Sequence, residues 1–177
     1  MQSLLPAIRF ALRRPSGLIA GLTAAWAIFG IVLGIDSELG LPPGTFYKMV
    51  GVAFGVDSSY AVYAGFILHM IAGVIIGIIY STLSQNIKKL HITSIQKGLG
   101  TGILTGVVVW AILFLPLNYG IMQPTLHNMA STTNPTSPEY LLANQLLALS
   151  NVIVFGSLAL HIVFGGVMGF CARLAVS

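Results

Sequence analysis

Two histidines stand at matching places in two of the most apolar stretches of the chain. His69 lies in LHMIAGVIIG and His161 in LHIVFGGVMG, and in each stretch glycines follow the histidine after four and eight residues. Imidazole nitrogens bind metal ions and transfer protons, and an ionisable side chain within an apolar helix is a functional candidate by default. The pair therefore indicates either a metal or proton site or hydrogen bonds between helices.

Hydrogen bonding accounts for both histidines without a bound ion. Each lies on a stripe of small residues, where a neighbouring helix comes close enough for a hydrogen bond worth about 0.6 to 2 kcal/mol. Two imidazoles are too few for a secure metal site, and no Asp, Glu or Cys is expected at their depth. We therefore expect His69 and His161 to join closely packed helices, with metal binding or proton relay as the alternative.

A second group of potential ligands lies in the segment before the last apolar run. Met122, His127 and Met129 carry thioether and imidazole groups, which suit copper. The segment 118–150 is long and polar, and a loop of this length usually serves binding or is held by a partner. We expect the three to be ordinary loop residues, with copper contact as the alternative.

The composition determines the solvent in which these residues act. Hydrophobic residues make up 56% of the 177 residues and charged residues only 7%, with a mean hydropathy of +0.92, unlike a soluble domain. Each of four uncharged runs is long enough to cross a hydrocarbon core of about 30 Å: 17–35, 59–83, 98–117 and 151–172. The sequence predicts a single all-α integral membrane domain over 1–177, with four transmembrane helices.

The charged residues predict the orientation. Seven of the eight Lys and Arg residues fall before the first run, between the second and third, or after the fourth: Arg9, Arg13, Arg14, Lys88, Lys89, Lys97 and Arg173. All four carboxylates fall in 36–58 and 118–150. By the positive-inside rule we expect both termini in the cytoplasm, these two segments as outer loops, and the plasma membrane as the location. Topology accounts for the charge of +4, so no nucleic-acid partner is expected.

The first sixteen residues are expected to remain attached as a short amphipathic helix on the inner membrane surface. Their apolar residues come before their arginines, which is the reverse of a secretory signal. Leu5, Ile8 and Leu12 share one face of a helix, while Arg9 and Arg13 share another. The segment 1–16 is therefore an inner interfacial helix by prediction.

Internal similarity indicates two parallel helical-hairpin repeats. Gly17, Gly21 and Trp26 resemble Gly102, Gly106 and Trp110, while the second and fourth runs share Leu-His and its spaced glycines. Each hairpin begins and ends inside, so a pseudo-twofold axis along the membrane normal would relate them. Small residues recur every four positions, and we expect them to bring helices together: Gly65, Gly73, Gly77, Gly102, Gly106, Gly165 and Gly169.

The spans with Leu68-His69 and Leu160-His161 resemble a loose group of small prokaryotic membrane proteins of unknown function. The overall design of four helices, a basic inner side and a long outer loop resembles the small accessory subunits of archaeal ammonia monooxygenase. That resemblance implies a structural role beside a partner that holds the copper, with no catalytic residue or intrinsic cofactor in this chain.

We therefore expect a non-catalytic accessory subunit, with membrane lipids and the other membrane subunits of a hetero-oligomeric complex as its partners. Neither a phosphate-binding loop nor a Ser-His-Asp set is present in the sequence, and no carboxylate falls within the predicted spans. The alternatives are a small transporter or channel, or a metal-handling protein that uses His69 and His161.

Overall fold

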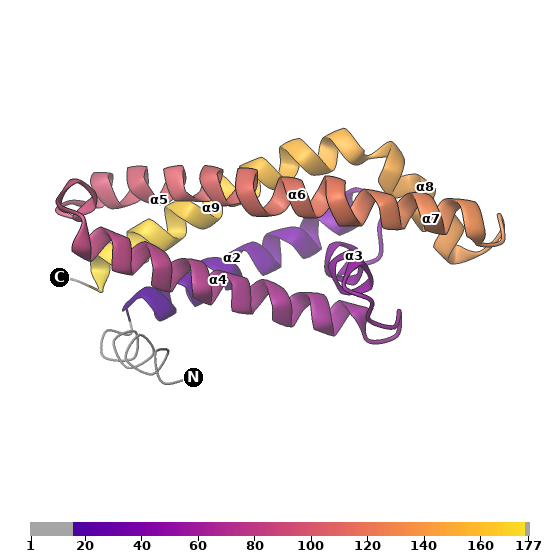
Figure 1. Ribbon diagram of the computed structural model, residues 1–177, viewed down its shortest axis with the longest axis horizontal. Coiled ribbons are helices and arrows are strands. Elements are labelled where there is room, and N and C mark those ends of the chain that lie inside the picture. Colours follow the sequence, from indigo (N-terminus) through magenta and orange to yellow (C-terminus); the bar gives the residue numbers. More distant parts are fainter. Residues whose placement is uncertain (1–15, 176–177) are drawn as a thin grey trace.

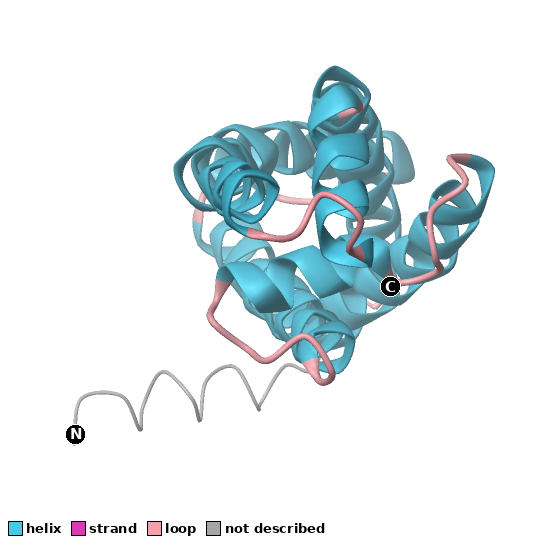
Figure 2. Cartoon of the chain, turned by 90° about the vertical axis from the view of Figure 1, so that its right-hand side faces the viewer, coloured by secondary structure: helices cyan, strands magenta, loops and turns pink. Residues whose placement is uncertain are grey.

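The chain is a bundle of helices joined by short loops (Figures 1 and 2). The computed structural model describes residues 16–175, and no strand occurs in that part. Four of its helices are long and apolar enough to cross a membrane, as expected for a multi-pass membrane protein. These four are α2 (Ser16–Glu38), α4 (Ala61–Asn86), a continuous helix Ile95–Thr132, and α9 (Ser150–Leu174). The interfacial helix predicted for 1–16 lies outside the described residues, apart from Ser16.

The third long helix differs most from the expected boundaries. We expected a span over 98–117 and an outer loop over 118–150, but the helix runs for 38 residues to Thr132. At about 1.5 Å per residue it is about 57 Å long, nearly twice the hydrocarbon core. A short helix, α8 (Pro138–Ala148), then returns beside its end (Figure 1). The expected irregular loop is thus a helical hairpin.

Two prolines within the long helix explain its internal irregularity. Its parts are α5 (Ile95–Val109), a π-helical turn (Trp110–Phe114), α6 (Leu115–Leu117), a second π-helical turn (Asn118–Met122) and α7 (Gln123–Thr132). Each π turn closes with a hydrogen bond from an N–H group to the carbonyl oxygen five residues earlier. The residue after that N–H group is a proline, Pro116 in the first turn and Pro124 in the second. Proline lacks an N–H group and collides with the carbonyl four residues before it. The wider turns let the helix continue through both prolines.

Glycines bring the long helices together in two pairs, α2 with α4 and α5 with α9. A methyl group added to Gly21 would overlap the carbonyl oxygen of Gly73, and one added to Gly102 would overlap that of Gly165. Both contacts are between backbones, so no side-chain rotation relieves them. A methyl group added to Gly73, Gly77, Gly106, Gly165 or Gly169 would likewise overlap an atom of the facing helix.

The two pairs make matching contacts, but one helical turn away from the alignment that the sequence suggested. We paired Gly17 with Gly102, yet the contacts of Gly102 resemble those of Gly21, because Gly73 and Gly165 hold the same place after their histidines. Trp26 and Trp110 therefore do not hold equivalent positions. Trp26 is 60% exposed on α2, whereas the Trp110 indole N–H donates a hydrogen bond to Ser157 Oγ at 3.0 Å.

A short helix, α3 (Thr45–Ala53), packs into the bundle between the pairs (Figure 1). It lies in the segment 36–58, which we expected to be an outer loop. In the structure Tyr47 and Met49 are almost fully buried, and Gly65 of α4 contacts the α3 backbone at Tyr47. The Asp36 carboxylate accepts a hydrogen bond from Gly44 N–H at 2.9 Å, at the N-terminus of α3 where a negative charge is favourable. This contact holds α3 against the end of α2.

We expect Gly102→Ala to destabilise the fold and Gly100→Ala, two residues away on α5, to leave it unchanged or slightly more stable. The added methyl group at 102 overlaps a backbone carbonyl, whereas at 100 it meets no atom within 4 Å. Overpacking costs about 1 to 3 kcal/mol, and replacing a helical glycine gains roughly 0.5 to 1 kcal/mol. Thermal unfolding of both variants in one detergent measures the difference. Equal midpoints would contradict the backbone contact.

Candidate functional site

A cavity of about 510 Å³ lies between the two helix pairs. Its walls come from α2, α3, α4, the long helix and α9, and they are almost entirely apolar. The helices α4 and α5 contact each other near Tyr80, whose hydroxyl lies 3.2 Å from Gly98 O and 2.8 Å from Thr101 Oγ1. Farther along they diverge (Figure 1), and wall residues such as Ile71, Ile75 and Leu113 are about half exposed. The cavity is therefore bordered by side chains that face the membrane.

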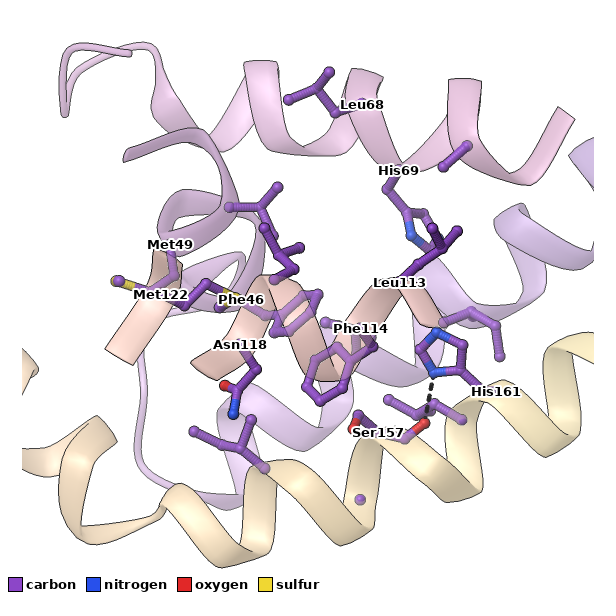
Figure 3. A pocket seen from close by; sticks show the side chains of 18 of the residues that line it. Phe46, Met49, Leu68, His69, Leu113, Phe114, Asn118, Met122, Ser157 and His161 are labelled. Atoms are coloured by element: carbon purple, nitrogen blue, oxygen red, sulfur yellow. Dashed lines mark hydrogen bonds between the residues drawn. The ribbon is translucent and has the colours of Figure 1, made fainter. Parts of the chain in front are cut away.

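Both histidines singled out by the sequence line this cavity (Figure 3). His69 comes from α4 and His161 from α9. His69 Nε2 lies 3.2 Å from the carbonyl oxygen of Ala25 on α2, as expected for a hydrogen bond between helices. His161 Nδ1 instead lies 2.7 Å from the carbonyl oxygen of Ser157, four residues earlier on its own helix.

These hydrogen bonds determine which nitrogen carries the proton in each neutral imidazole. A carbonyl oxygen only accepts, so the nitrogen bonded to it must carry the hydrogen. His69 Nε2 and His161 Nδ1 are then the donors, and His69 Nδ1 and His161 Nε2 keep their lone pairs. Two lone pairs beside one cavity supply two of the ligands that a metal site needs, but no third ligand accompanies them within residues 16–175. Among the described residues no group of three or more His, Cys, Asp or Glu could hold an ion.

Asn118 is a buried polar residue of the cavity wall that the sequence analysis missed. It is 4% exposed, and its Nδ2 is buried with no hydrogen-bond partner among the described residues. It begins the second π turn, and Phe114 and Met122 of the two π turns also line the cavity. Such π turns often lie at functional sites. The prolines were the available signal, because a proline within a helix predicts a local rearrangement of the residues before it.

The structure does not bring the suggested copper ligands together. Met122 is buried in the cavity wall and His127 is exposed on α7, while Met129 packs at the edge of the apolar cluster that contains Met122, Leu126 and Leu146. Met122 and His127 are five residues apart on a helix, so they project about 140° from each other. His127 therefore lies away from both thioethers and from the pair His69 and His161.

The Tyr47 hydroxyl, like Asn118 Nδ2, is buried and has no hydrogen-bond partner in the described part of the chain. Its ring packs against His69, with centroids 5.5 Å apart, and against the ring of Phe66. Burial, and to a smaller extent the charge of Asp36, raises the pKa of the Tyr47 phenol well above its usual range. Tyr47 therefore stays neutral and acts as a packing residue beside His69.

Comparisons with known proteins add no family or relative. No protein-family model, no curated protein and no solved structure matches this chain. The function must therefore be argued from the residues of the cavity and from the surfaces around it.

We expect Tyr47→Phe to leave the protein as stable or stabilise it, and Tyr80→Phe to destabilise it by about 1 kcal/mol. The first change removes a buried hydroxyl that lacks a partner, whereas the second removes hydrogen bonds to Gly98 O and Thr101 Oγ1. Both variants keep the ring, so the packing is matched. Thermal unfolding in detergent compares them. A larger loss for Tyr47→Phe than for Tyr80→Phe would mean that the Tyr47 hydroxyl has a partner.

Proposed function

We propose that this protein is a non-catalytic subunit of a larger membrane assembly, in which it packs against the helices of its partners. The observation that carries the proposal is a second small-residue face on α2. Gly30 and Gly34 are exposed, and a methyl group added to either meets no atom within 4 Å. They form the small-xxx-small pattern that lets two membrane helices approach closely. Within residues 16–175 no other helix packs against Gly30 or Gly34.

The geometry of α2 supports different packing partners for its two sides. Gly21 packs against α4, and Gly30 lies nine residues later, on about the opposite side of the helix. The same helix thus has one glycine face inside the fold and one facing outward. The projecting α7–α8 hairpin is a further surface for a partner, since the long helix continues well past the length of a membrane span.

The finer parts of the proposal rest on the sequence. We propose the plasma membrane as the location, two parallel hairpin repeats as the arrangement, and a copper-dependent ammonia monooxygenase as the assembly, with copper held by a partner subunit. The matching glycine contacts of the two helix pairs support the repeat. The enzyme is suggested by the resemblance of overall design alone.

A transporter, channel or metal-handling protein is the second candidate. It is favoured by one observation, the presence of His69 and His161 in the wall of one cavity. The cavity wall is apolar apart from a few side chains, which does not resemble a water-filled pore.

We expect the native chain to migrate in a large complex, and Gly30→Leu together with Gly34→Leu to release it. The leucines would fill the space that a partner helix needs, and a Cβ atom at either position meets no described atom within 4 Å. The measurement is a native gel of the membrane extract in mild detergent, with partner chains and copper identified by mass spectrometry. Gly100→Leu, another exposed glycine with open space around it, is the matched control. If the native chain migrates alone the proposal is wrong, and if it then retains metal the second candidate gains support.

We expect the α7–α8 turn to lie outside the cell and the α4–α5 connection to lie inside. Replacing Cys171, the single cysteine, by Ser allows one new cysteine at an exposed position, Lys89→Cys or Asn134→Cys. A membrane-impermeant maleimide added to intact cells should label Asn134→Cys at once and Lys89→Cys only after permeabilisation. The opposite labelling would reverse the orientation derived from the basic residues.

A further inference from the structure

We propose that two copies of this chain pair through α2, with the Trp26 indole N–H of each copy donating a hydrogen bond to the Thr23 hydroxyl of the other. The two α2 helices run parallel and are related by a twofold axis along the membrane normal, since both copies insert in the same direction. The inference rests on the proposed function, because it names the occupant of the α2 face that was proposed above to contact a partner.

Thr23 and Trp26 are polar side chains of α2 that no other part of the described chain satisfies. Thr23 is exposed and Trp26 is 60% exposed, and no hydrogen bond joins either side chain to another residue within 16–175. Comparable side chains of the long helix do have partners. The Trp110 indole donates to Ser157 Oγ at 3.0 Å, and the Thr105 hydroxyl donates to the carbonyl four residues earlier at 2.8 Å. Thr23 and Trp26 therefore need a partner from outside the described chain.

The depth of these side chains excludes water as that partner. Trp26 comes ten residues after Ser16, the first residue of α2, so it is about 15 Å along a helix of about 34 Å. Ala25, next to it, contacts Gly73, which lies midway along α4. Tryptophan in membrane proteins is usually found at the water interface, where its N–H is hydrated. An unpaired N–H or hydroxyl group in hydrocarbon is unfavourable, so we expect another protein helix to cover Trp26 and Thr23.

One face of α2 supplies a donor, an acceptor and room for close approach. At about 100° per residue, Thr23, Trp26, Gly30 and Gly34 fall within roughly 80° of one another. An indole N–H only donates, whereas a hydroxyl oxygen accepts. A helical side chain leans toward the N-terminus of its helix, so Trp26 of one copy lies level with Thr23 of a parallel neighbour. The open space at Gly30 and Gly34 lets the two helices come together.

A second copy satisfies both polar groups at once, because this face is complementary to itself. In a twofold pair each copy contributes one donor and one acceptor, so two identical hydrogen bonds form and neither Thr23 nor Trp26 is left over. An unrelated helix would need its own acceptor and its own donor at these same two levels of the membrane.

The test measures energy transfer between copies of the full-length chain in lipid vesicles. With Cys171→Ser, the variant Asn134→Cys carries a donor dye on one population and an acceptor dye on the other. Transfer that saturates as the protein-to-lipid ratio rises gives the dissociation constant of the pair. Trp26→Phe and Thr23→Val should each weaken the pair roughly tenfold, since each removes both hydrogen bonds. Thr105→Val, whose hydroxyl bonds within its own helix, is the matched control and should change nothing.

A mixture of the two variants distinguishes the hydrogen bond from an effect on packing. Copies with Trp26→Phe keep the acceptor and copies with Thr23→Val keep the donor. A mixed pair therefore forms one of the two hydrogen bonds, whereas neither variant forms any with itself. We expect the mixed pair to bind about threefold more tightly than either variant alone. Altered packing alone would give a mixed pair of intermediate strength.

The pairing itself has its own decisive outcomes. The absence of saturable energy transfer in the unaltered chain, or its survival when Gly30→Leu and Gly34→Leu are combined, would overturn the pairing of two copies. A mixed pair no tighter than the tighter of the two variants would overturn the hydrogen bonds between Trp26 and Thr23.

These outcomes are distinguishable from failure of the proposed assembly. The vesicles contain this chain alone, whereas the native gel reports the other subunits. If copies do not pair in vesicles but the native chain migrates in a large complex, the second copy is wrong and the assembly stands. If the native chain migrates as a pair without other chains, the assembly is wrong and the pairing stands.

Discussion

Direct contact between helix backbones at glycines is the constraint on which the rest of the fold depends. There is no space for a side chain where Gly21 meets Gly73 or where Gly102 meets Gly165. Each helix pair therefore crosses at a point where both residues are glycine. In a membrane the lipid tails are as apolar as leucine, and close packing replaces the hydrophobic effect as the source of helix association. The divergence of α4 and α5 away from their contact near Tyr80, and hence the cavity, follows from these fixed points.

The long helix Ile95–Thr132 shows how local chemistry shapes the cavity wall. Pro116 and Pro124 each remove a backbone donor, and each is preceded by a π turn that lets the helix continue. The π turns Trp110–Phe114 and Asn118–Met122 contribute several wall residues, among them the unpartnered Asn118. A proline that suggests the end of a span in the sequence thus follows a turn whose residues line the candidate site.

The candidate site was predictable only in part. Repetition and apolar surroundings marked His69 and His161, and both line the cavity. Asn118 is not part of a repeat and does not lie within an apolar run. A polar residue at the end of an apolar run usually indicates the start of a loop. Met122 and His127 were grouped by their chemistry, yet their spacing on a continuous helix separates them. The grouping assumed a loop, where side-chain directions are unconstrained.

The sequence by itself determined that this protein has four apolar membrane helices with small-residue faces, because composition and four-residue spacing are local properties that a helix displays directly. Only the tertiary structure decided which glycine meets which carbonyl, with the α2–α4 and α5–α9 contacts one turn from the suggested alignment. It also decided that His69, Asn118 and His161 line one cavity. These contacts and this shared cavity depend on the register between neighbouring helices. That register is set where the backbones touch, and the sequence does not encode it locally.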